Sequence, residues 1–308
     1  MTLVDASFAA RLLPKRPPDS HKGDYGKAFL LCGSEGLTGA ARLAAEGCLR
    51  AGAGLIILGA PRSIYPILAI SCPPEIMCLP LPEDDVGRLS LEALPIIRDR
   101  LEWCDAALIG PGLGRSKALT KLVRQLCDKR EKPLVVDADG LNALSGHILV
   151  QRPAPLFLTP HDGEFMRLGG DADDPGRADA AWKLAARMRA VVVRKGHETL
   201  TVSPLGTVYA NTSGNPGMAK GGSGDVLAGF LTGLVAQKAA NPPLWEGCDW
   251  SMLAACAVFW HGRAGDLCAA KLGPYGMTPS DLVARLPLAM RGTGTPVLVE
   301  SGKLKVES

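Results

Sequence analysis

One stretch of the chain, residues 211–230, combines residue types that could do chemistry on a phosphate. Its glycines let a backbone approach a ligand closely and adopt positive φ angles. A helical apolar pattern follows from residue 225, so the amides of residues 223–225 should face an anion bound before that helix. Asp225 either caps this helix or acts as a general base, because a carboxylate beside a bound phosphate is repelled unless its charge is used. These residues alone leave both roles open.

The loop lacks the signatures of two common nucleotide-binding folds. It does not read GxxxxGK[ST], and no GxGxxG follows a predicted strand, including GPGLG at residues 110–114. These observations weigh against a P-loop NTPase and a dinucleotide-binding Rossmann domain.

The composition limits the classes of protein to which the chain can belong. The 308 residues are 47% hydrophobic and 21% charged with a net charge of +3, which is typical of a globular protein and lacks the basic stripe of a nucleic-acid binder. The apolar run at residues 252–260 is too short to span a bilayer, and Asp5 and Arg11 interrupt the first apolar stretch, so we expect no signal-peptide h-region there. The nine cysteines form no CxxC pattern. We therefore expect a cytoplasmic protein with reduced cysteines and with neither nucleic-acid nor membrane partners.

The loop needs a scaffold, which the alternation of short apolar runs and helical patterns supplies. Strands buried on both faces are predicted at 28–32, 55–58, 106–109, 134–136, 156–158 and 191–193, with a late hairpin at 200–202 and 208–209. Helices are predicted at 38–50, 116–127, 175–188, 225–237 and 252–270. Alternating βαβ units predict one three-layer α/β domain over residues 1–308, with a largely parallel central sheet flanked by helices.

Polar or glycine-rich residues follow five of these strands. Ligands bind at the carboxyl ends of parallel strands, so we expect the five ends to converge on one cleft. Singly, these residues have ordinary explanations: His161 as a structural or helix-start residue, Lys195 as a solvated strand end, Asp137 and Asp139 as turn or cap residues, and His197 as a surface residue. Together with the glycine-rich loop, they favour an enzyme acting on a nucleotide phosphate.

Six motifs between about residues 21 and 286 resemble the NAD(P)H-hydrate dehydratases, a family with a ribokinase-like fold. The last motif is the most specific. They are HKGDYGKAFLLCGSEGLTGAA (21–41), GPGLG (110–114), VVDADGLNAL (135–144), LTPHDGEF (158–165), VVVRKGHET (191–199) and GNPGMAKGGSGDVLAG (214–229).

The resemblance implies repair of NADHX or NADPHX, the hydrated forms of NADH and NADPH. ADP would phosphorylate the ring hydroxyl of the S epimer, and loss of phosphate would restore NAD(P)H with AMP as the other product. Asp225 would be the base on the hydroxyl. The hydrate would contact Ala40, Gly112, Gly114, His161 and Asp225. The nucleotide would contact Lys195, Gly196, His197, Glu198, Thr199, Asn215, Gly217, Gly222, Ser223 and Gly224.

The resemblance also implies Mg²⁺, brought in by the nucleotide, and a homo-oligomer. Asp137, Asp139 and Glu164 are acceptable oxygen ligands for such an ion, without a preference among them. We expect no fused epimerase domain, so a separate NAD(P)H-hydrate epimerase would be the metabolic partner. Asp162 is a departure, because many members have proline there, and its charge could alter how substrate phosphates are tolerated.

Two alternatives share parts of this pattern. A kinase of a vitamin precursor, of the hydroxymethylpyrimidine or thiazole type, would have the same glycine loop and aspartate, but the motifs before the loop argue against it. A regulatory protein that senses nucleotides would not need the retained Asp225.

Overall fold

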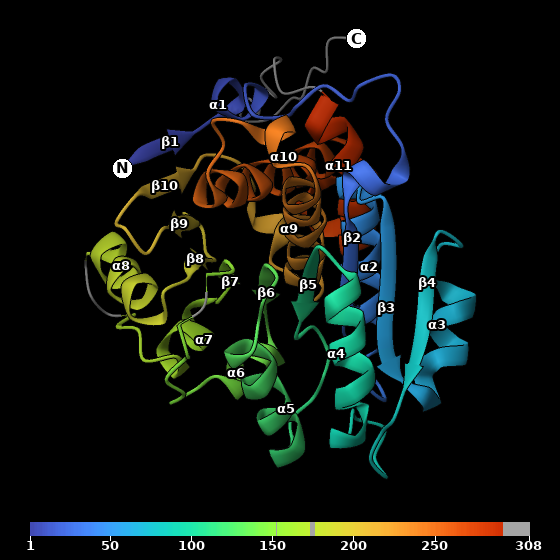
Figure 1. The fold of residues 1–308 in the computed structure, drawn as a ribbon. Coiled ribbons are helices and arrows are strands. Elements are labelled where there is room, and N and C mark those ends of the chain that lie inside the picture. Colours follow the sequence, from blue (N-terminus) through green and yellow to red (C-terminus); the bar gives the residue numbers. More distant parts are fainter. Residues whose placement is uncertain (152, 173–175, 292–308) are drawn as a thin grey trace.

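The computed structural model describes residues 1–151, 153–172 and 176–291, and a ten-stranded sheet forms its centre (Figure 1). The strand order is β1-β10-β9-β8-β7-β6-β5-β2-β3-β4. In the described chain β9 is antiparallel to both of its neighbours, and the other pairings are parallel. The strands are β1 (Thr2–Val4), β2 (Lys27–Leu31), β3 (Leu55–Pro61), β4 (Ile76–Leu81), β5 (Ala106–Ile109), β6 (Leu134–Val136), β7 (Leu156–Leu158), β8 (Val191–Arg194), β9 (Leu200–Val202) and β10 (Val208–Asn211).

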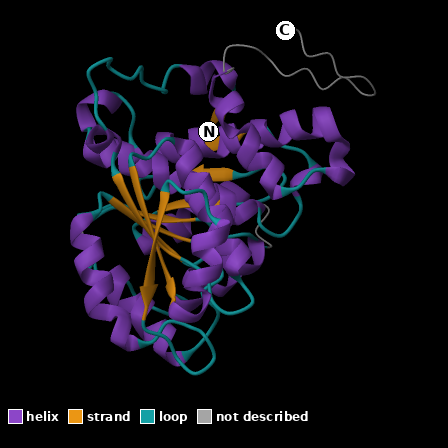
Figure 2. Cartoon of the chain, turned by 90° about the vertical axis from the view of Figure 1, so that its right-hand side faces the viewer, coloured by secondary structure: helices purple, strands orange, loops and turns teal. Residues whose placement is uncertain are grey.

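Helices cover both faces of the sheet (Figure 2). Successive strand residues point to opposite faces, so Ala28 and Leu30 join one apolar cluster while Phe29 and Leu31 join the other. The result is the predicted three-layer α/β architecture. The helices are α1 (Ala6–Ala10), α2 (Thr38–Ala51), α3 (Tyr65–Ser71), α4 (Leu94–Trp103), α5 (Lys117–Asp128), α6 (Asp139–Ala143), α7 (Asp162–Arg167), α8 (Arg177–Met188), α9 (Ser223–Ala240), α10 (Trp250–Gly276) and α11 (Pro279–Arg291).

The predicted strands are confirmed with shifts of a few residues at their ends, and the hairpin is β9–β10. β1 and β4 were not predicted. β1 has three residues, and β4 contains Pro80, which is tolerated because β4 lies at the edge of the sheet. The predicted helix at 175–188 is α8; its first predicted residue, Pro175, lies outside the described residues.

Helix α9 is buried along most of its length, as expected for a helix that is apolar all round. It packs closely on α2 because glycines remove the intervening side chains. A Cβ atom on Gly229 would lie 1.8 Å from the Ala44 carbonyl oxygen, and one on Gly233 would lie 2.6 Å from that of Cys48. This backbone-to-backbone packing fixes the beginning of α9, and with it Asp225, relative to the sheet.

Two further observations concern the described chain. None of its helices combines the length and apolar character needed to cross a membrane. All nine cysteines are free thiols; Cys78 is half-buried and the others are buried. The prediction of unpaired cysteines that pack in the interior is thus confirmed.

Candidate active site

The strand ends predicted to converge do meet at one edge of the sheet. The amide of Gly33, after β2, donates to the carbonyl of Pro111, after β5, at 2.8 Å. After β6, the Asp137 carboxylate accepts a hydrogen bond from Lys195 Nζ, after β8, at 2.7 Å. His161, after β7, forms a parallel bridge with Lys195. Five loops from distant parts of the sequence therefore build one site.

Asp137 is the centre of the charged part of this site and is only 1% exposed. Its Oδ1 accepts from Thr159 Oγ1 at 2.7 Å and from Lys195 Nζ at 2.7 Å. Glu164 Oε2 lies 3.9 Å from the same ammonium. Burial alone lowers the pKa of Lys195, but the attraction of Asp137 and Glu164 outweighs it and the pKa is raised. Lys195 therefore stays charged, and Asp137 is an ion-pair partner rather than the turn or cap residue considered from sequence.

The backbone around Asp137 is constrained. Ala138 has φ 49° and ψ −118°, an unfavourable conformation for a residue with a side chain. Gly110, with φ 141°, packs against the Asp137 backbone, and a Cβ on Gly110 would come within 1.8 Å of the Asp137 carbonyl oxygen. The GPGLG turn therefore needs its first glycine so that β5 and β6 can end side by side at the site.

Asp225 lies in the first turn of α9 and is not its N-cap. The N-cap is Gly222, in a left-handed conformation with φ 103°, so the capping interpretation of Asp225 is wrong. Burial raises the pKa of Asp225 to about 7, the negative charge of Asp137 adds to this, and the positive charge of Lys195 opposes it. A carboxylate with a pKa near neutrality is suited to general-base chemistry, because it is basic and still ionises at physiological pH.

The glycines of the loop before α9 serve different purposes. A Cβ on Gly217 would lie 2.5 Å from Met277 Sδ, and one on Gly222 would lie 2.6 Å from Leu43 Cδ1, so these two are small because the protein packs against them. Gly221 has no atom within 4 Å of its Cβ position. A Cβ on Gly224 would lie 3.3 Å from Lys195 Nζ, which places Gly224 beside the charged cluster. Gly224 is therefore the loop glycine that adjoins the charged cluster, whereas Gly221 is exposed and a Cβ there would contact no other part of the described chain.

The other residues predicted to contact the nucleotide differ in whether their polar atoms are already bonded within the protein. Ser223 Oγ is buried and has no hydrogen-bond partner in the described part of the chain, so it is available to a ligand. Thr199 Oγ1 donates to the Gly196 carbonyl at 3.0 Å and closes the turn after β8. Asn215 Nδ2 donates to Asp266 Oδ1 at 3.0 Å, which ties the loop to α10. His197 and Glu198 are exposed on the turn after β8.

Among the predicted hydrate residues, Ala40 and Gly112 lie against each other, while Gly114 and His161 are held by neighbouring backbone and side-chain groups. A Cβ on Gly112, with φ 65°, would lie 2.9 Å from Ala40 Cβ, so the two residues are in contact. The amide of Gly114 donates to Asp139 Oδ2 at 2.9 Å. His161 is the N-cap of α7, where its Nδ1 accepts from the amide of Gly163 at 3.0 Å. The helix-start interpretation of His161 is confirmed.

Asp162 is paired away from the charged centre. Its Oδ1 accepts from Arg194 Nε at 2.8 Å, and Arg177 Nη1 lies 3.8 Å from its Oδ2. Arg194 is fully buried and its guanidinium lies 4.4 Å from the ring centroid of Phe165. The charge added at this position is therefore compensated within the protein.

Sequence reasoning missed a contribution from α10. The Gly214 amide donates to Asp266 Oδ2 at 2.9 Å, and His261 is buried with its pKa lowered to about 4 by burial. Two glycines inside this helix were the available signal, since Gly262 and Gly265 leave no space for a Cβ against Ser213 and Met218. The loop before α9 is held by α10 on one side.

The carboxylates do not form a ready-made metal cage. No group of three or more metal-binding side chains occurs in the described ranges. Asp137 accepts from Lys195, Asp139 accepts from the Gly114 amide, and Glu164 accepts from the His161 amide at 3.0 Å. These residues do not fit a preformed magnesium site.

The largely parallel sheet flanked by helices, with a glycine-rich loop before α9, is the fold of a ribokinase-like protein. A ribokinase-like protein from Enterococcus faecalis superposes with a TM-score of 0.81 at 27% identity, covering 95% of this chain and 96% of that one. The NAD(P)H-hydrate dehydratase family matches residues 28–288. The chain belongs to this family.

Two relatives and one further structure give the scope of the match. An ADP-dependent (S)-NAD(P)H-hydrate dehydratase from Xanthomonas campestris is 34% identical over 93% of this chain and 94% of its own length. A bifunctional NAD(P)H-hydrate repair enzyme from Moorella thermoacetica is 42% identical, and the chain spans 54% of its length. The ADP/ATP-dependent dehydratase from Bacillus subtilis, co-crystallised with ATP and Mg²⁺, has a TM-score of 0.79 at 28% identity, covering 95% and 98% of the two chains.

Proposed function

We propose that the protein is an ADP-dependent dehydratase that restores NAD(P)H from the S epimer of NADHX or NADPHX. The observation that carries this is Asp225, a carboxylate with pKa about 7 held beside Lys195 and Asp137 at the start of α9. The relative from Xanthomonas campestris supports ADP as the nucleotide and the S epimer as the substrate. Reduced thiols support a cytoplasmic location.

In this reaction the Asp225 carboxylate takes the proton of the ring hydroxyl, and the oxygen of that hydroxyl attacks the β-phosphorus of ADP. The bond from that phosphorus to the AMP oxygen breaks, and AMP leaves with the bonding electrons. The ring nitrogen then supplies its electron pair, the carbon–oxygen bond breaks, phosphate leaves, and loss of the neighbouring proton restores the double bond. Phosphoryl transfer depends on positioning and charge, which the α9 amides and Lys195 would supply.

The hydrate would lie on the side of Asp225 formed by Ala40, Gly112, Gly114 and His161, and the nucleotide on the side of residues 195–199 and the loop before α9. Ser223 Oγ, buried without a partner in the described chain, is a donor suited to a phosphate oxygen. Magnesium would enter with the nucleotide. A homo-oligomer, and an NAD(P)H-hydrate epimerase activity as metabolic partner, complete the proposal.

The test is incubation of the purified protein with S-NADHX and ADP or ATP, with and without Mg²⁺, following absorbance of the restored dihydronicotinamide. We expect turnover with ADP and release of AMP. Better turnover with ATP would contradict the choice of nucleotide. No turnover with either nucleotide would favour the alternative function, a kinase of a vitamin precursor. Such kinases share the fold: a hydroxyethylthiazole kinase from Pyrococcus horikoshii superposes with a TM-score of 0.56 at 11% identity.

A further inference from the structure

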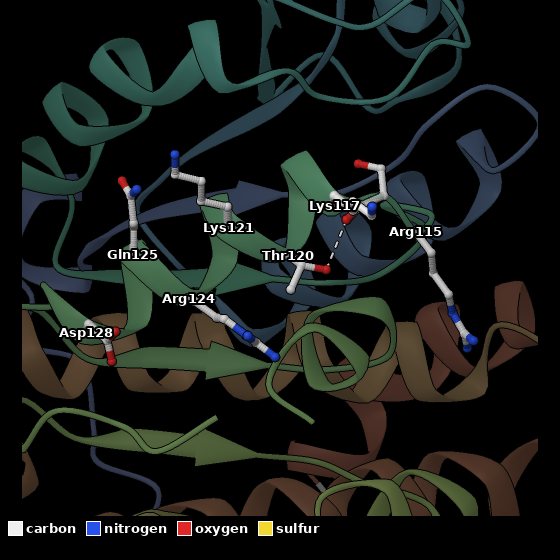
Figure 3. A pocket seen from close by; sticks show the side chains of 8 residues that line it. Arg115, Lys117, Thr120, Lys121, Arg124, Gln125 and Asp128 are labelled. Atoms are coloured by element: carbon white, nitrogen blue, oxygen red, sulfur yellow. Dashed lines mark hydrogen bonds between the residues drawn. The ribbon is translucent and has the colours of Figure 1, made fainter. Parts of the chain in front are cut away.

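Four cationic side chains line an open hollow of about 610 Å³ along helix α5, outside the site described above. We call Arg115, Lys117, Lys121 and Arg124 the α5 basic patch. Figure 3 shows Arg115 at the beginning of the helix, and Lys121 and Arg124 extending from its two flanks. Asp128, at the far end, is the acidic residue among the lining side chains. The hollow therefore carries a net positive charge.

The charge of the α5 basic patch is largely uncompensated. Lys117 and Lys121 are exposed, and neither ammonium has an ion pair or hydrogen bond within the described ranges. The guanidinium of Arg124 donates to the carbonyl oxygens of Ala143 and Ser145, both at 2.8 Å, which leaves its charge unpaired. Arg115 pairs with Asp139, so Lys117, Lys121 and Arg124 are the cations left to attract a multiply charged anion.

The patch is continuous with the proposed hydrate side of the active site. A smaller hollow of about 80 Å³ is lined by Gly114, Asp139 and Asn142, and it shares Arg115, Ser116 and Thr120 with the larger one. Arg115 Nε also lies 3.4 Å from Asp139 Oδ1. A molecule that occupied the hydrate side could thus extend past Gly114 onto α5, away from the loop proposed to hold ADP.

We propose that the α5 basic patch binds the 2′-phosphate of NADPHX, so that the protein prefers NADPHX to NADHX. This inference rests on the proposed function. With the hydrated ring at Gly112 and Asp225, the adenosine end of the dinucleotide must leave the cleft, and α5 lies along the exit beside Gly114. A phosphate monoester carries a charge of about −1.5 to −2 at pH 7, and lysine binds it as a point charge. NADHX lacks this group.

The test compares the dissociation constants of NADPH and NADH, whose adenosine ends match those of the two hydrates, by fluorescence titration. We expect the unaltered protein to bind NADPH more tightly. In the double variant Lys117→Gln/Lys121→Gln, the preference should shrink by about threefold to tenfold, as expected for the loss of two exposed charge contacts. The preference of the unaltered protein should also decrease at high salt.

The control is Lys15→Gln/Lys22→Gln, which removes the same charge from exposed positions before β2. This control variant should keep the preference of the unaltered protein for NADPH over NADH. Equal affinity of the unaltered protein for the two dinucleotides would overturn the inference, and so would a loss of equal size for both in the α5 variant. Turnover of NADHX with ADP is measured in parallel: turnover without a preference refutes only the patch, whereas a preference without turnover refutes only the proposed reaction.

Discussion

Asp225→Asn separates the roles of its carboxylate because it keeps the size of the side chain and removes its charge. In the folded protein, burial and the neighbouring Asp137 raise the pKa of Asp225 from 3.8 to about 7. Between these two values the folded state binds more protons than the unfolded state, so the free energy of unfolding falls as pH rises through that window. Three pKa units correspond to about 4 kcal/mol, an upper limit to the cost of ionised Asp225 above pH 7.

The asparagine variant does not bear this cost. We expect its free energy of unfolding, from urea denaturation, to exceed that of the unaltered protein by up to about 4 kcal/mol at pH 8 and by up to about 1.5 kcal/mol at pH 5. Turnover should fall by roughly a hundredfold to ten-thousandfold, the usual contribution of a positioned base. ADP affinity should hold or rise, since the carboxylate repels phosphate.

The matched control is Asp249→Asn. Asp249 is the N-cap of α10 and its Oδ1 accepts from the Met252 amide at 2.8 Å. Asparagine caps as well as aspartate, so stability and turnover should both be nearly unchanged. Near-normal turnover in Asp225→Asn would remove Asp225 from the mechanism. A stability difference that did not change with pH would refute the raised pKa.

A pH–rate profile and three further substitutions probe Asp225 and the surrounding residues. The unaltered enzyme should lose about tenfold in rate per pH unit below about pH 7, where protonated Asp225 cannot accept a proton, as a pH–rate profile would show. Lys195→Met should lower the free energy of unfolding at pH 7 by about 3–5 kcal/mol, because a buried carboxylate loses its cation; an unchanged urea midpoint would contradict this. Asp162→Ala should cost about 1–3 kcal/mol, since buried Arg194 loses an acceptor; calorimetric unfolding measures it. Gly224→Ala should weaken ADP binding in a folded protein, measured by titration calorimetry.

Gly221→Ala is the control for Gly224→Ala. It lies in the same loop and has no atom within 4 Å of its Cβ position, so the added methyl group meets no protein atom. Equal losses of ADP affinity in both variants would mean that the phosphate approaches both positions. Unchanged affinity in Gly224→Ala would place the nucleotide elsewhere. Gly222 is unsuited to this test, because substitution there clashes with Leu43 whatever the ligand does.

The strands and central helices were predictable because their apolar patterns are local. Strands β6 and β7 match the prediction at both ends, since each is a continuous apolar run bounded by polar or proline residues. Edge strand β4 was not predicted, because Pro80 interrupts its apolar pattern. The start of α9 was placed two residues late, because the left-handed Gly222 that ends the loop is a conformational property rather than a compositional one.

The site was predictable in its location and less so in its electrostatics. Strand ends and the glycine loop indicated where the ligands should bind and made Asp225 a candidate cap or base, and the resemblance implied the role of base. The pairing of Asp137 with Lys195 could not be read from a single sequence, because the two residues are far apart along the chain and meet only through the order of the strands. The structural use of Gly217 and Gly222 was hidden for the same reason, since Gly217 packs against the end of α10 and Met277, and Gly222 packs against Leu43 of α2.

The Lys195–Asp137 pair has a consequence for Asp225 beyond holding the strand ends together. A buried carboxylate is stabilised by an adjacent cation, and Lys195 Nζ lies 2.7 Å from Asp137 Oδ1. The negative charge of Asp137 in turn raises the pKa of Asp225. The lysine itself lowers the pKa of Asp225, so the two partners act in opposite directions on the base. Their balance leaves Asp225 near neutrality, basic enough to accept a proton from a hydroxyl and yet ionised in a useful fraction of molecules.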